Sequence, residues 1–100
     1  MIYTFMMLDK AGGSAMRPAL RPAHRAYIEQ VADRIAFAGG LLADDGNTIV
    51  GSLLAIDFPD RAAASAWLRE EPFTKAGLYA SVQIHAFRNR WPQRTGFPEE

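Results

Sequence analysis

Three stretches of the chain concentrate aromatic and branched apolar residues, and their spacing predicts β-strands. Residues 2–8 are apolar at both odd and even positions, which is typical of a strand covered on both faces. Residues 48–56 share this pattern. In residues 79–87 the even positions are apolar, and polar residues fall between them. A short fourth strand is expected at residues 41–43.

Two other stretches follow the helical period. Residues 17–38 are predicted to form the first helix, with its regular part beginning near Pro22, because proline is tolerated in or before a first turn. Gly39 and Gly40 are expected to end this helix. Its apolar stripe comprises His24, Tyr27, Ile28, Val31 and Ile35. The second helix is expected to follow Asp60, a good N-cap residue.

Glycines and prolines predict the turns between these elements. The pair Asp45 and Gly46 is typical of a hairpin turn. Pro72 lacks a backbone donor and disfavours helical geometry at the residue before it. Glu71 is therefore predicted to lie at a fixed corner where the second helix ends. Gly77 allows the positive φ of a further reversal before the last strand.

The order of elements is β-α-β-β-α-β, which predicts an α+β fold of the ferredoxin-like type with an antiparallel sheet. Two helices can cover only one face of such a sheet, yet two strands are apolar on both faces. A second copy of the chain is the expected cover, so we predict a homodimer formed through the sheet face. The domain is expected to span residues 1–88, and residues 89–100 to form an irregular tail.

The composition indicates one small folded domain. The chain has 100 residues, of which 49% are hydrophobic and 22% charged, and this suffices for a single core. Eleven basic and eleven acidic residues cancel, so neither nucleic acid nor a membrane is an expected partner. The absence of cysteine excludes disulfides and thiolate zinc sites. Without a leader or a long apolar run, a cytoplasmic protein is expected.

His24 is the first candidate for chemistry, because it lies on the apolar stripe and should point inward, where an imidazole can carry protons. A lone histidine on such a face is more often a core residue, and that alternative stays open. Asp33 is excluded as its partner, since about nine residues of helix place it on the opposite side. Glu71 arrives from another element and can approach the stripe; its alternative is a solvated acid at a helix end.

Two further residues are candidates for holding a small-molecule ligand. Ser52 lies within a buried strand, so its hydroxyl needs a partner, which is backbone, water or a ligand. Arg21 lies near the positive end of the first helix and could hold an anion; a plain surface arginine is the alternative. Arg25 and Glu29 are expected to form an exposed ion pair away from the stripe. Two histidines without a spaced third ligand, and no phosphate loop, predict neither metal nor cofactor.

A set of short motifs, in their order and spacing, resembles one known family. They are Asp9-Lys10, Arg21-Pro22-Ala23-His24, Gly51-Ser52, Ala66-Trp67, Glu71-Pro72-Phe73 and Ala76-Gly77-Leu78-Tyr79. The family is that of the YCII-related proteins, and the resemblance covers nearly all of the chain up to Phe87. It implies a dimeric α/β barrel in which two sheets pack face to face. It also implies a site centred on His24 and Glu71, with Ser52 nearby, where the family usually has Asp in place of this Glu.

Two functions from different classes are consistent with these residues. The first is a small cofactor-independent enzyme, a lyase or isomerase, in which His24 is the acid/base and Glu71 its orienting carboxylate. Ser52 and Arg21 would position a small polar or aromatic metabolite. The family's dehydrochlorinase-like member, which acts on a chlorinated hydroxyquinol, implies this kind of elimination. The second is a non-catalytic metabolite-binding or accessory module, and a purely structural role for His24 is a third possibility.

Overall fold

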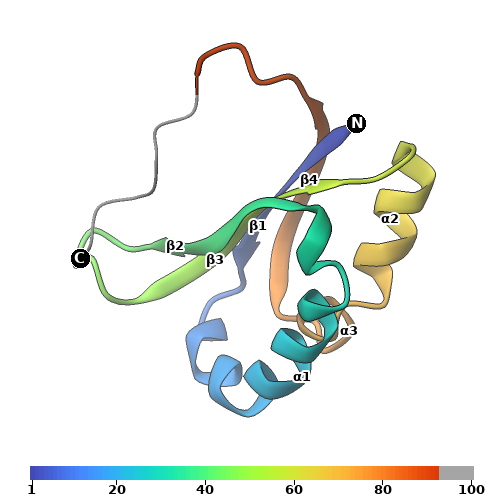
Figure 1. The fold of residues 1–100 in the computed structure, drawn as a ribbon. Helices are drawn as coiled ribbons and strands as arrows, with labels where there is room; N and C mark the ends of the chain where they lie inside the picture. Colours follow the sequence, from blue (N-terminus) through green and yellow to red (C-terminus); the bar gives the residue numbers. More distant parts are fainter. Residues whose placement is uncertain (93–100) are drawn as a thin grey trace.

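The protein folds into a four-stranded antiparallel sheet with its helices gathered on one side (Figure 1). The computed structural model describes residues 1–92, so most of the predicted tail at residues 89–100 lies outside the described part. In chain order the elements are β1 (Ile2–Asp9), the 3₁₀ turn η1 (Gly13–Met16), α1 (Arg17–Glu29), the 3₁₀ turn η2 (Ala32–Arg34), β2 (Ile35–Leu42), β3 (Ile49–Asp57), α2 (Arg61–Arg69), α3 (Pro72–Lys75) and β4 (Tyr79–Phe87).

The strands stand side by side in the order β2-β3-β1-β4, and every neighbouring pair is antiparallel. The connection from β1 through α1 to β2 therefore passes over β3, and the connection from β3 through α2 to β4 passes over β1. This is the split β-α-β arrangement. The predicted fold class, α+β and ferredoxin-like, is confirmed.

The core lies between the sheet and the helices. Alternate residues of the central strand β1 face this layer, and Phe5 and Met7 are completely buried there. The ring of Phe5 contacts Phe58 and Trp67, with centroid distances of 5.9 and 5.5 Å. Aromatic edge contacts of this kind add about 1 kcal/mol each beyond the burial of area. The core thus fixes α2, which carries Trp67, against the middle of the sheet.

The other face of the sheet, which we call the open face, carries apolar side chains as well. Met6 and Leu8 of β1 point to it and are 40% and 43% exposed. The strand register places Leu53 of β3 beside Met6, and Phe87 of β4 lies beside the first residue of β1. Within one chain, residues 2–8 are therefore covered on one face alone, as expected for a sheet with helices on a single side. The cover of the open face by a second copy stays a prediction.

The predicted first helix was wrong at its C-terminal end. It was expected to run over residues 17–38, but α1 ends at Glu29, and residues 35–42 form β2. The alanines and isoleucine of this stretch fit a helical period, yet β3 needs a partner on its outer edge, and the tertiary pairing overrides the local preference. The expected strand at residues 41–43 is only the end of β2, and Gly39 and Gly40 lie inside this strand instead of ending a helix.

The helix begins at Arg17, as predicted, but its regular part starts about one turn earlier than expected. Pro18 and Pro22 both lie within α1, whose first residue is Arg17, whereas its regular part was expected to start near Pro22. A proline near the N-terminus costs little, because the first N–H groups of a helix have no intrahelical acceptor. The extra turn matters for the site, since it places Arg17 on the same helical face as Arg21 and His24.

The predicted turns are confirmed. Glu71 is extended, with φ −69° and ψ 132°, and caps the short helix α3 that begins at Pro72. Gly77 has φ +77°, in the left-handed region that favours glycine. Asp60 caps α2 by accepting a hydrogen bond of 2.8 Å from the backbone N–H of Ala63. Among residues 1–92, no helix has the length and apolar character needed to cross a membrane.

We predict that Gly51→Ala destabilises the protein by about 1–3 kcal/mol, as overpacking does in other cores. A Cβ atom at Gly51 would lie 2.3 Å from the backbone carbonyl oxygen of Met7, so β1 and β3 would have to move apart. Gly39→Ala is the matched control, because a Cβ atom there meets nothing within 4 Å. Urea unfolding measures both variants. Equal stabilities for the two variants would show that the close approach of β1 and β3 at Gly51 does not exclude a Cβ atom.

Candidate active site

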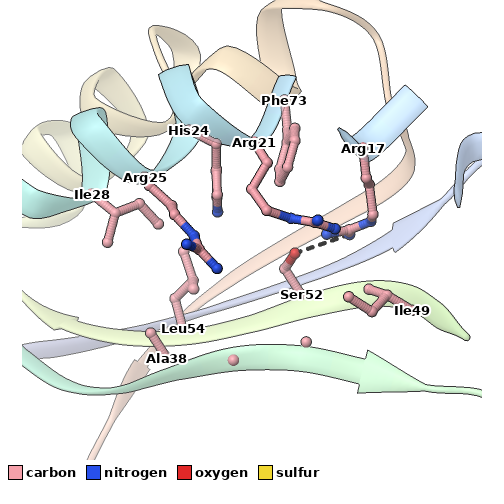
Figure 2. Close-up of a pocket in the computed structure, with 12 residues that line it drawn as sticks. Arg17, Arg21, His24, Arg25, Ile28, Ala38, Ile49, Ser52, Leu54 and Phe73 are labelled. Atoms are coloured by element: carbon pink, nitrogen blue, oxygen red, sulfur yellow. Dashed lines mark hydrogen bonds between the residues drawn. The ribbon is translucent and has the colours of Figure 1, made fainter. Parts of the chain in front are cut away.

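A cleft of about 330 Å³ lies between α1 and the part of the sheet formed by β2 and β3. Figure 2 shows Arg21, His24 and Arg25 extending from α1 into this space. The residues that line it are Arg17, Arg21, His24, Arg25, Ile28, Ala38, Gly39, Gly40, Ile49, Ser52, Leu54 and Phe73. Small residues on β2 and a hydroxyl on β3 thus form the floor, and basic residues form the wall.

His24 and Glu71, which are 47 positions apart in the sequence, are in contact. The Nδ1 atom of His24 bonds Oε1 of Glu71. The other carboxylate oxygen accepts hydrogen bonds from the backbone N–H and the hydroxyl of Thr74, at 3.0 and 3.2 Å. Glu71 is 1% exposed and lies behind His24, outside the lining of the cleft. Both oxygens of its carboxylate are therefore used inside the protein.

These bonds determine where the protons lie. Burial by itself would raise the pKa of Glu71, but the hydrogen bonds from His24 and from the backbone of Thr74 and Phe73 outweigh it and hold the pKa below the ordinary value of 4.5. An ionised carboxylate can only accept hydrogen bonds, so Nδ1 of His24 must carry a hydrogen. In the neutral imidazole the lone pair is then on Nε2, and the ring points into the cleft (Figure 2).

Phe73 fixes the plane of the imidazole. Its ring stacks on that of His24 with a centroid distance of 3.9 Å and an interplanar angle of 20°. The guanidinium of Arg17 lies 4.9 Å from the centroid of the Phe73 ring. Glu71 is the N-cap of α3, and Phe73 lies within this helix. The same short segment therefore binds Nδ1 of His24 and restricts rotation of the imidazole.

A second polar network lies beside the imidazole, at the end of the cleft. Arg17 donates two hydrogen bonds to the carboxylate of Asp9, at 2.8 and 2.9 Å, and a third to the hydroxyl of Ser52 at 3.2 Å. The Ser52 hydroxyl is also 3.2 Å from that of Tyr79. A register shift between β1 and β4 pairs Tyr79 with Asp9 and brings the phenol into this network. Four elements are therefore joined by one chain of hydrogen bonds.

This network leaves a hydrogen-bond donor for a ligand. Burial raises the pKa of Tyr79 to about 12, so its phenol stays protonated at neutral pH. Ser52 and Tyr79 together have two hydroxyl hydrogens but only one bond between them, and among residues 1–92 the second hydrogen has no acceptor. When Tyr79 is the donor in their shared bond, the free hydrogen is that of Ser52, which lines the cleft, and an oxygen atom bound there can accept it.

The sequence-based candidates converge only in part on the cleft. His24, Ser52 and Arg21 line it, whereas Glu71 supports the imidazole from behind. Arg25 was expected to form an exposed pair with Glu29, and this was wrong: no such ion pair exists within the described chain, and Arg25 lines the cleft. The expectation had placed Arg25 away from the apolar stripe, but it lies one residue after His24 and beside it at the cleft.

Arg17 and Tyr79 were not identified from the sequence. Arg17 lay before the expected start of the regular helix, so its spacing of four and seven residues to Arg21 and His24 was not counted. Tyr79 is the first residue of the predicted last strand, and the alternation along that strand does not reveal the register shift that pairs it with Asp9. The available signal was the family motif Ala76-Gly77-Leu78-Tyr79, in which Tyr79 is the last residue. Among residues 1–92, no three metal-ligating side chains come together in a way that could hold a metal ion.

Residues 1–88 match the YCII-related domain, and the protein belongs to this family. The curated relatives include Protein YciI of Escherichia coli O6:H1, which is 33% identical over 95 residues, with 88% of this chain and 97% of the relative aligned. An uncharacterized protein of Haemophilus influenzae is 30% identical over 95 residues, and the alignment again covers 88% of this chain and 97% of the relative. The predicted family membership is confirmed.

A solved structure extends the likeness to three dimensions. It is that of the 5-chloro-2-hydroxyhydroquinone dehydrochlorinase TftG from Burkholderia phenoliruptrix AC1100, in complex with 2,5-dihydroxybenzoquinone. The two chains match with a TM-score of 0.83 over 90% of this chain and 96% of TftG, at 24% sequence identity. At this identity, the likeness establishes a shared fold.

We predict that the charge of Glu71 stabilises the fold in a pH-dependent way. Its pKa in the folded protein lies below 4.5, so its contribution is fully present above that pH and is lost as the pH falls through the lower folded value. Below pH 4.5, the free energy of unfolding should therefore fall less steeply in Glu71→Gln than in the unmodified protein, because an amide does not titrate. Urea unfolding at a series of pH values measures both slopes.

Glu70→Gln is the control for this experiment, since the neighbouring Glu70 side chain is 67% exposed. At neutral pH, Glu71→Gln should cost about 2 kcal/mol through loss of charge-assisted hydrogen bonds, and Glu70→Gln less than about 0.5 kcal/mol. Parallel slopes for Glu71→Gln and the unmodified protein would contradict a lowered pKa of Glu71.

Proposed function

We propose that the protein is a small cofactor-independent enzyme of the lyase or isomerase type, in which His24 is the general acid/base. The observation that carries this proposal is the arrangement of the imidazole: a buried carboxylate binds Nδ1, and the ring points into an open cleft. A histidine whose one ring nitrogen is bound to a carboxylate presents its other nitrogen, in a fixed orientation, for proton transfer. Glu71 orients the ring and stabilises the imidazolium that forms, as the carboxylate of a catalytic triad does.

The proposed step is a proton transfer followed by rearrangement of the substrate's electrons. Nε2 of His24 takes a proton from a carbon or hydroxyl of the substrate, and the electron pair of the broken bond forms a new double bond. In an elimination, a leaving group departs with its own electron pair; in an isomerisation, His24 returns the proton at another position. Ser52 and Arg21 hold the substrate oxygen on which negative charge develops.

The fold shared with TftG supports elimination as the first reaction to test. TftG is a dehydrochlorinase of 5-chloro-2-hydroxyhydroquinone. Loss of hydrogen chloride needs a base for the proton, while chloride leaves with the bonding pair. Because neither step requires an electron acceptor, the chemistry fits a site with an imidazole, a carboxylate and hydrogen-bond donors.

We expect His24→Gln to lower turnover by at least about 10²-fold, because loss of a general base typically costs 10²–10⁴. The assay follows 5-chloro-2-hydroxyhydroquinone and related halogenated hydroxyquinols by absorbance. His85→Gln is the matched control: it removes the other histidine, which is exposed on β4 and should leave turnover unchanged. Circular dichroism establishes that both variants are folded. Turnover by folded His24→Gln at the unmodified rate would rule out an acid/base role for His24.

A non-catalytic metabolite-binding module is the alternative, and the basic wall of the cleft favours it. Arg21 and Arg25 can bind an anion whether or not chemistry follows. In that case a ligand would bind in the cleft, and no panel of halogenated or isomerisable substrates would show turnover. Replacement of His24 would then change the affinity for the ligand and nothing else.

We also propose that the open face of the sheet is covered by a second copy of the chain. Its exposed apolar side chains, which include Met6, Leu8 and Phe87, support this proposal, since a monomer rarely exposes a contiguous apolar patch of this kind. A symmetric dimer buries the same patch of both copies.

We predict that Met6→Glu converts the protein to a monomer of 11.1 kDa in sedimentation equilibrium, because each copy would bury a carboxylate in an apolar interface. Val82→Glu is the control, since Val82 is equally exposed but is paired with Met7, whose side chain faces the helices. This control should remain dimeric. An unmodified protein that sediments as a monomer at all concentrations would overturn the proposal of a dimer.

A further inference from the structure

Three arginines stand in one row along α1. Arg17, Arg21 and Arg25 are spaced four residues apart, so they follow the same face of the helix with a rise of about 6 Å between neighbours. Figure 2 shows their side chains directed into the cleft, above Ser52 and Leu54. His24 lies on the same face and points into the space between the second and third arginine.

The three arginines differ in how their charge is balanced. Arg17 is 5% exposed, and its two bonds to Asp9 neutralise it, so it belongs to the framework of the site. Arg21 and Arg25 have no carboxylate partner among residues 1–92. Two uncompensated guanidinium groups in one small cleft repel each other, and an anion bound between them removes this repulsion.

The floor of the cleft leaves room for such an anion. Ala38, Gly39 and Gly40 of β2 have little or no side chain, and they lie across the cleft from the arginines. Neither the floor nor the basic wall contributes a carboxylate to the cleft, because Glu71 lies behind His24. An anionic ligand would therefore meet cationic and hydrogen-bond donor groups, without a facing negative charge.

The geometry points to a small organic dianion as the ligand of this cleft, with one acidic group bound by Arg21 and the other by Arg25. Guanidinium groups bind carboxylate and phosphate oxygens in pairs, so each arginine suits one such group. The part of the ligand between the two acidic groups then lies at Nε2 of His24, and the free hydroxyl hydrogen of Ser52 donates to the group held by Arg21. This inference rests on the proposed function, because it names the substrate class of the same site.

The size of the cleft limits this class to compact molecules. Its volume of about 330 Å³ is at the lower end of the range for ligand sites. A short dicarboxylic acid or a phosphorylated acid of similar length fits within this volume. Simple dicarboxylates are therefore suitable probes of the two-arginine site.

The experiment measures binding to the full-length protein by calorimetry at low ionic strength. The probes are maleate and succinate, with butyrate as a monocarboxylate of equal carbon number and inorganic phosphate as a single compact anion. We expect at least one dicarboxylate to bind about tenfold or more tightly than butyrate. Phosphate binding equal to that of the dicarboxylates would show a single oxyanion site, and this result would overturn the two-group assignment.

Substitutions locate the bound probe. Arg21→Gln and Arg25→Gln should each weaken dicarboxylate binding by about tenfold and reduce the preference over butyrate. Arg69→Gln is the matched control, because Arg69 is an exposed helical arginine outside the cleft and its loss should leave affinity unchanged. Unchanged affinity in both cleft variants, or no binding of either dicarboxylate at millimolar concentration, would overturn the inference.

The His24→Gln variant separates this inference from the enzymatic proposal. If the cleft binds dianions and His24 acts as a base, His24→Gln loses turnover but retains binding of the dicarboxylate probe. Dicarboxylate binding without turnover of any substrate in the unmodified protein would refute the enzyme and leave the ligand class standing. Turnover without discrimination between dicarboxylate and monocarboxylate inhibitors would refute the ligand class and leave the enzyme standing.

Discussion

The structure depends on a negative charge that the fold removes from water. A buried carboxylate is strongly unfavourable unless hydrogen-bond donors replace its hydration. At Glu71, the N-terminus of α3 and the imidazole of His24 supply these donors, so the same contacts that permit burial also join α3 to α1. Because both carboxylate oxygens are occupied, Glu71 can act on a ligand only through His24. The same hydrogen bonds therefore stabilise this corner of the fold and orient the imidazole.

The ion pair of Asp9 and Arg17 has the complementary effect at the other end of the cleft. It neutralises one positive charge, and a further N–H of Arg17 holds Ser52, which in turn contacts Tyr79. The two buried pairs leave the cleft with an imidazole nitrogen, a hydroxyl and two guanidinium groups that lack a carboxylate partner within residues 1–92. The chemical character of the cleft follows from which charges the fold has already neutralised.

Local signals predicted the elements that depend on local chemistry. The cap at Asp60, the proline corner at Glu71 and the positive φ of Gly77 each rest on a few neighbouring atoms, and all three are present. The end of α1 was not predictable in this way, because residues 35–38 suit either a helix or a strand and only pairing with β3 decides between them. Likewise, no periodicity brings Glu71 to His24; that expectation came from the family resemblance.

The glutamate at position 71 illustrates how one side chain can serve two elements. The resemblance leads one to expect an aspartate here, and an aspartate at an N-cap places its carboxylate close to the backbone of its own helix. With one more methylene group, Glu71 still accepts a bond from the N–H of Thr74 while its second oxygen reaches Nδ1 of His24. A shorter acid would make both bonds only if α3 lay closer to α1. With the longer side chain, α3 does not need to lie closer to α1 for the imidazole to keep its carboxylate partner.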